Sequence, residues 1–117
     1  MSHFGEYIRR RREELKKQNP DYSLRRVAAR LGVQPSYLSQ VERGGQAPPT
    51  EAKVLALADI LGEDPDVLLA LAGKVSGDLQ AVIRKRPKLF GQLIRELADL
   101  PDHAVLRLVR EVRDGDW

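Results

Sequence analysis

Apolar residues recur every three or four positions along almost the whole chain, and this pattern predicts an all-α protein. Val54, Leu57, Ala58 and Leu61, for example, share one face of a helix. The alternating pattern that is typical of half-buried strands is nearly absent. The expected helices cover about residues 4–17, 24–31, 35–42, 51–61 and 65–72, followed by 78–85, 87–100 and 102–114.

Capping residues and breaks define the ends of these helices. Ser23 and Thr50 stand where an N-cap is favoured, and Asp64 followed by Pro65 is typical of a helix start. Gly32 follows the second helix, and we expect it in the left-handed conformation that ends many helices. The stretch "QNPDY" carries turn residues and separates the first helix from the second.

The stretch "GKVSG", residues 73–77, is the best linker in the chain. We expect residues 1–73 to form a five-helix domain, residues 74–77 to link it, and residues 78–117 to form a helical dimerisation or regulatory segment. The later helices carry apolar stripes that are large for their length and must pack on something. The residues expected to form a dimer interface are Phe90, Leu93, Ile94, Leu97, Val105, Leu106, Val109 and Val112.

Composition argues against several kinds of site. The 117 residues include no Cys and only two His, so we expect no disulfide, no metal centre and no cofactor. Nucleophile elbows and Gly-rich phosphate loops are missing, so we do not expect an enzyme. The chain has no apolar leader and no run of about 18 apolar residues, and we therefore expect a soluble, cytoplasmic protein.

Positive charge is concentrated in the first part of the chain. Residues 1–47 hold ten Lys/Arg and five Asp/Glu, a surplus of +5, whereas residues 48–117 hold ten and twelve, a balance of −2. A basic half favours a polyanionic partner such as nucleic acid. The alternative is the solvated charge of ordinary helix surfaces.

The sequence "SLRRVAARLGVQPSYLSQVERG", residues 23–44, predicts two short helices joined by a tight turn. Such helices cross steeply, and the pair needs a small residue at the crossing, here Ala28, and a Gly in the turn, here Gly32. A simple αα-hairpin would not need this spacing together with a polar outer face, so the pattern favours DNA binding. The apolar core positions around the turn are Val27, Leu31, Val33, Leu38 and Val41.

With "FGEYIRRRREEL" before it and "PTEAKVLALADILGEDPDVLLALAG" after it, this segment resembles phage-repressor-like regulators of the Cro and xenobiotic-response-element family. The resemblance covers residues 4–73. It implies a lambda-repressor-like domain that binds a palindromic DNA operator as a homodimer, most often as a repressor. The connection "KKQNPDY" is longer than usual in the family, and Arg11 stands where many members have an apolar residue.

The resemblance also implies roles for individual residues. The helix over residues 35–42 would enter the major groove as the recognition helix. The residues implied at base edges are Gln34, Pro35, Ser36 and Gln40. The residues implied at the DNA backbone are Ser23, Arg25, Arg26, Tyr37, Ser39 and Arg43, although solvated charge stays an alternative for the Arg residues. The family often pairs an Arg of the first helix with the Glu of "ERG", which here are Arg12 and Glu42.

The sequence leaves the role of the C-terminal helices open. They could pair with a second chain, pack on the first domain, or bind a protein or small ligand. Some repressors of the resembled family occur beside toxins or regulatory metallopeptidases, so the alternative function is an antitoxin or a regulator bound by such a protein. The basic run "RKRPK", residues 84–88, either extends the DNA footprint or is an exposed helix junction.

Overall fold

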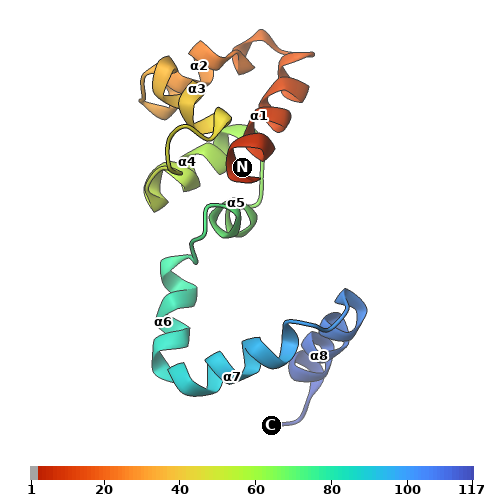
Figure 1. Ribbon diagram of the computed structural model, residues 1–117. Coiled ribbons are helices and arrows are strands. Elements are labelled where there is room, and N and C mark those ends of the chain that lie inside the picture. Colours follow the sequence, from red (N-terminus) through yellow and green to blue (C-terminus); the bar gives the residue numbers. More distant parts are fainter. Residues whose placement is uncertain (1–2) are drawn as a thin grey trace. The chain divides into compact units, whose positions relative to one another are not determined.

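The computed structural model describes residues 3–117, and Figure 1 shows a chain of helices joined by short loops. None of these described residues lies in a strand, so the all-α prediction is confirmed for them. The helices are α1 (His3–Lys16), the 3-10 helix η1 (Pro20–Tyr22), α2 (Leu24–Leu31), α3 (Pro35–Arg43), α4 (Glu51–Leu61), α5 (Pro65–Leu71), α6 (Gly77–Lys85), α7 (Pro87–Leu97) and α8 (Asp102–Asp114). Two compact units divide between Ser76 and Gly77, and each is described by itself.

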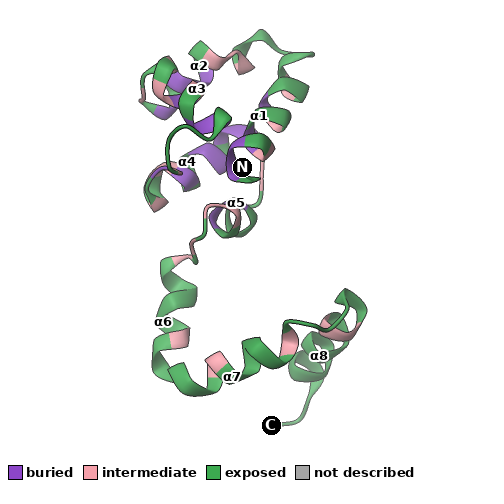
Figure 2. Cartoon of the chain, viewed as in Figure 1, coloured by how far each residue is buried: buried purple, intermediate pink, exposed green. Residues whose placement is uncertain are grey.

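The first unit holds a hydrophobic core to which α1 to α5 all contribute, as the buried positions in Figure 2 show. The three- and four-residue spacings within each helix explain why these side chains share an inward face. Tyr22 and Tyr37 pack against the core from its edge. The buried apolar residues are Phe4, Ile8, Val27, Ala28, Leu31, Leu38, Val41, Val54, Leu57, Ala58, Ile60, Leu61, Leu68 and Leu69.

The turn between α2 and α3 depends on Gly32. Its φ of 78° and ψ of 34° lie in the left-handed region, as expected from the sequence. This conformation lets the Val33 amide donate to the Ala28 carbonyl at 3.0 Å, while the Gly32 amide donates to Ala29 at 3.2 Å. The two bonds close the end of α2 and send the chain directly into α3.

Some expected helix ends are wrong. The first helix ends at Lys16, and α7 ends at Leu97 rather than near Leu100. The segment expected to be a simple turn forms η1, because Pro20 and the Asn19 cap favour a short helical turn. Thr50 occupies the N-cap position of α4, but its side chain makes no capping hydrogen bond, so the expectation of a side-chain cap is wrong there.

Two basic side chains close the C-terminal ends of helices in the core. Lys53 Nζ donates to the Leu31 carbonyl at 2.8 Å, and Arg11 Nε donates to the Leu61 carbonyl at 3.2 Å. Arg11 Nε also lies 3.1 Å from Glu63 Oε1. A cation near the last carbonyls of a helix is favourable. The polar residue at position 11 is therefore accommodated at the edge of the core.

Helix α1 approaches α3 through Gly5. A Cβ built on this buried glycine would overlap the Val41 carbonyl oxygen and lie 2.7 Å from the Glu42 carbonyl oxygen. Both neighbours are backbone atoms of α3, so they can yield only if the helix moves. The absence of a side chain at Gly5 allows the close contact between the two helices.

We expect Gly5→Ala to lower the free energy of unfolding by about 1–3 kcal/mol, the usual range for overpacking. Urea denaturation followed by circular dichroism would measure the loss. Gly91→Ala is the matched control, because Gly91 is also helical but a Cβ there would meet only the end of Arg95, at 3.5 Å. A Gly5→Ala protein as stable as the control would contradict the close approach.

The second unit, residues 77–117, contains α6, α7 and α8. All of its residues are described, and none of them is buried. Leu93, Ile94, Leu106, Val109 and Val112 remain about half exposed or more. Such apolar exposure is costly in water.

In the described part of the chain, no helix is long and apolar enough to cross a membrane.

Candidate nucleic-acid interface

Helix α3 has one buried face and one polar, accessible face. Leu38 and Val41 point into the core. Gln34, Ser36 and Gln40 are exposed on the other side. Pro35 at the first helical position is half-buried, and Gln34 is the N-cap residue. The structure thus brings the four residues predicted at base edges to the accessible side of α3.

The Gln40 side chain turns toward the loop that follows α3. A Cβ built on Gly45 would overlap Gln40 Oε1, so the carboxamide lies directly over that glycine. This placement is possible because residue 45 has no side chain.

Tyr37 and Ser39 are less accessible than the three Arg residues predicted at the DNA backbone. Both are half-buried, and Tyr37 packs against the hydrophobic core. Ser39 lies beside a hollow between α1, α2 and α3. Tyr37 therefore contributes to core packing, whereas Ser39 contributes to the lining of the hollow.

The hollow beside Ser39 has a volume of about 240 Å³ and is mainly polar in its lining. Arg9 and Arg43 contribute exposed guanidinium groups to it, and Arg9 Nε lies 3.4 Å from Glu13 Oε1. Sequence reasoning missed Arg9; its place three residues before Arg12 was the available signal, because that spacing keeps both on one helix face. The lining residues are Arg9, Arg12, Glu13, Leu24, Ser39, Glu42 and Arg43.

The N-terminus of α2 forms a second polar region. Ser23 caps the helix, and its Oγ accepts a hydrogen bond from the Arg26 amide at 3.3 Å. Arg25 and Arg26 are exposed and line a hollow with Ser23 and Ala29. A capped helix start with free backbone donors and nearby cations favours an anion.

Arg12 and Glu42 form a buried, bidentate ion pair between α1 and α3. Arg12 Nε donates to Glu42 Oε2 at 2.7 Å, and Arg12 Nη2 donates to Glu42 Oε1 at 2.9 Å. The side chains are only 7% and 5% exposed. Arg12 Nη1 also donates to the Tyr22 carbonyl at 3.2 Å. The bonds to Glu42 raise the pKa of Arg12 above its ordinary value, against the effect of burial.

The pair has a direct consequence for α3. One guanidinium holds the last turn of α3, the body of α1 and the end of η1 in a single arrangement. Such planar, bidentate bonds specify orientation as well as distance. Arg12 and Glu42 therefore orient α3, although neither side chain is accessible.

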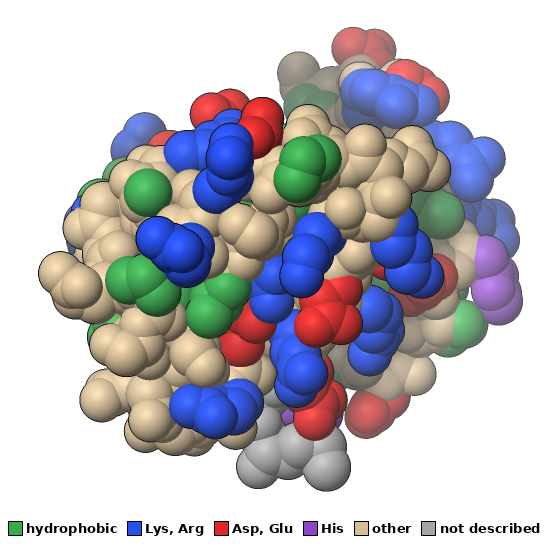
Figure 3. Space-filling model, turned by 90° about the horizontal axis from the view of Figure 1, so that it is seen from above, with side chains coloured by type: hydrophobic (Ala, Val, Ile, Leu, Met, Phe, Trp, Pro, Cys, Tyr) green, Lys and Arg blue, Asp and Glu red, His purple; other side chains and the backbone are tan. Residues whose placement is uncertain are grey.

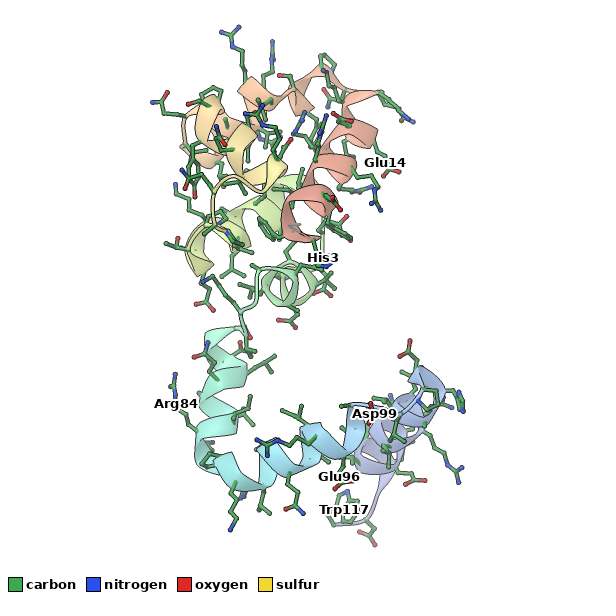
Figure 4. The ribbon with its side chains drawn as sticks, viewed as in Figure 1. His3, Glu14, Arg84, Glu96, Asp99 and Trp117 are labelled. Carbon is green, nitrogen blue, oxygen red and sulfur yellow. The ribbon has the colours of Figure 1, made fainter. Side chains whose placement is uncertain are left out.

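Positive charge is spread over the end of the first unit that carries these elements. Figure 3 views the molecule from this end and shows Lys and Arg side chains with acidic side chains between some of them. In the second unit, the Arg84 side chain extends outward from α6 (Figure 4), and its Nη2 donates to Gln80 Oε1 at 3.1 Å. The run 84–88 spans the end of α6 and the start of α7, and all of its residues are exposed.

Comparison with known families shows which family the first unit matches. A family described as a helix-turn-helix domain matches residues 3–71, from the start of α1 to the end of α5. Searches of the curated proteins and of the solved structures found no significant match. The family match covers more than half of the chain and includes α2, the Gly32 turn and α3. The chain therefore belongs to the helix-turn-helix domain family and is a DNA-binding regulator.

Proposed function

We propose that the protein is a transcriptional repressor of the phage-repressor-like type that binds a palindromic operator as a homodimer. The observation that carries the proposal is the two-sided character of α3. Its inner face is held by the core and by the Arg12–Glu42 pair, whereas its outer face offers exposed hydrogen-bonding groups. A rigid helix with a polar outer face is suited to the major groove.

Base reading is assigned to the start and middle of α3. Gln34 and Gln40 can each make paired hydrogen bonds to adenine, and Ser36 can donate or accept at several base edges. Pro35 has no donor and supplies apolar contact, for example to a thymine methyl. Because these residues carry no charge, they contribute to sequence preference more than to general affinity.

Contacts to the DNA backbone are assigned to the rim around α3. One part of this rim is Ser23 with the α2 N-terminus, and another is the hollow with Arg9 and Arg43. Phosphates bound at both places would fix the register of α3 in the groove. The remaining backbone contacts in this proposal come from Arg25, Arg26, Tyr37 and Ser39.

The homodimer is assigned to the second unit. Within residues 77–117, all of them described, α6 to α8 bury no residue although α7 and α8 carry strong apolar stripes. A second copy of the same surface covers such stripes by two-fold symmetry. Two recognition helices held about 34 Å apart would then read both halves of a palindrome. Binding there would block access of other proteins to the same DNA.

The test compares Gln40→Ala with Arg43→Ala. The operator is first found by sequencing the genomic fragments that the purified protein retains. We expect Gln40→Ala to weaken operator binding by about 1–3 kcal/mol and to leave random DNA nearly unaffected. Arg43→Ala should weaken both kinds of DNA and lower the log–log salt slope by about 1, because it removes a phosphate contact.

Fluorescence anisotropy over a range of salt concentrations gives both quantities. Equal losses by Gln40→Ala on operator and random DNA would refute base reading by that residue. If the DNA affinity of the wild type does not change with salt concentration, docking in the groove is refuted. Retained fragments without two-fold symmetry would refute the palindromic operator.

A further inference from the structure

The connection between α1 and α2 is an ordered turn. Asn19 Oδ1 accepts from the Asp21 amide at 2.9 Å, and the Ser23 amide donates to the Pro20 carbonyl at 3.1 Å. The Tyr22 carbonyl accepts from the buried Arg12. Residues 19–23 are thus held in place by local bonds and by a bond to the core.

This turn presents a carboxylate beside the start of α2. Asp21 Oδ1 lies 2.6 Å from Arg26 Nη1, and the two side chains are 54% and 64% exposed. Asp21 is two residues before the cap Ser23, and Arg26 belongs to the first turn of α2. The Asp21 carboxylate therefore pairs with Arg26, one of the cations beside the α2 N-terminus.

We propose that Asp21 competes with a DNA phosphate for Arg26 and thereby restrains the affinity of the protein for DNA. The inference rests on the proposed function, in which the α2 N-terminus approaches the DNA backbone. In the free protein, the Asp21 carboxylate pairs with Arg26 in the place that a DNA phosphate would take. On DNA, a phosphate oxygen replaces it at Arg26, and Asp21 is left to solvent next to a polyanion.

The exchange has a distinct electrostatic signature. When Arg26 leaves Asp21 for a phosphate, the DNA loses a condensed cation but the freed carboxylate attracts one. Arg26 therefore adds little to the salt dependence of the wild type. If the carboxylate is removed, the same contact releases a cation with no compensation, which adds about 0.9 to the log–log salt slope.

A structural role for the pair predicts a different result. Both side chains are more than half exposed. If the pair only fastened the turn to α2, neutralising Asp21 would loosen the turn and leave DNA affinity unchanged or weaker. A gain in affinity that depends on Arg26 therefore separates competition for phosphate from a structural role.

The experiment measures binding to operator and random duplexes for wild type, Asp21→Asn, Arg26→Gln and the double variant. We expect Asp21→Asn to tighten binding of both duplexes about twofold to fivefold, the range of an exposed ion pair. The salt slope should rise by about 0.9. In the Arg26→Gln background, Asp21→Asn should change neither quantity by a comparable amount. Asp59→Asn, at an exposed carboxylate on α4, controls for the change in net charge.

Each outcome decides a specific point. If Asp21→Asn raises DNA affinity equally with and without Arg26, or does not raise it, the inference is wrong. Salt-dependent DNA binding by the wild type would still support the proposed function. Absence of DNA binding by the wild type overturns both. Thermal melting verifies that each variant is folded. If Asp21→Asn unfolds the protein, Asp21→Ser, which also suits the turn, takes its place with the same expected gain.

Discussion

Glu42→Gln should lower the free energy of unfolding by about 3–5 kcal/mol, the usual cost of leaving one member of a buried ion pair without its partner. The substitution preserves the size of the side chain but removes the charge that compensates Arg12. The Arg12 guanidinium is only 7% exposed and cannot turn to water without opening the contact between α1 and α3. Urea denaturation followed by circular dichroism would measure the loss.

Two further variants make this result specific. Glu13→Gln is the matched control, because Glu13 is 53% exposed, pairs with Arg9 on the surface and lies 4.0 Å from Arg12 Nη2 without a hydrogen bond to it; it should cost less than about 1 kcal/mol. Arg12→Met combined with Glu42→Leu removes both buried charges and should be more stable than Glu42→Gln alone. If Glu42→Gln and Glu13→Gln have equal cost, the pair between α1 and α3 is not a buried one in solution.

A chain that ends at Ser76 should bind the operator about 10²–10⁴-fold more weakly than the full chain, the range expected when two linked sites become independent. The first unit should remain folded, because its core is built from α1 to α5. Without α6 to α8, the proposed dimer is lost, and each recognition helix must bind its half-site alone. Light scattering and operator titration would measure the two consequences.

A point substitution separates dimerisation from other effects of the truncation. Val109→Asp places a charge on the stripe of α8 and should produce monomers in the full chain, with a similar loss of operator affinity. Leu55→Asp, at an exposed apolar residue of α4, is the matched control and should leave the dimer intact. A full-length protein that is monomeric at micromolar concentration, or a truncated chain that still dimerises, would disprove the assignment of the dimer to the second unit.

Features that depend on neighbours in sequence could be predicted well. The bounds expected for α2 agree with the structure, because Ser23 and Gly32 act within one helical turn of its ends. The polar outer face of α3 followed from the three-residue spacing of Leu38 and Val41, which places both on one side of the helix. Local hydrogen bonds and helical periodicity are encoded in a few adjacent residues, so the fold class and the accessible side of α3 could be predicted without the structure.

Features that depend on how helices cross were decided by the tertiary structure. The capping of α4 by Arg11, across 50 residues of sequence, has no local signal. The same is true of the backbone contact at Gly5, the place of Arg9 beside the hollow, and the Gln40 carboxamide over Gly45. The Arg12–Glu42 pair was implied only by resemblance to a family. Helical periodicity indicates which face of a helix is buried, but the partner atoms at that face depend on crossing angles and distances, which are set only when all five helices pack around one core.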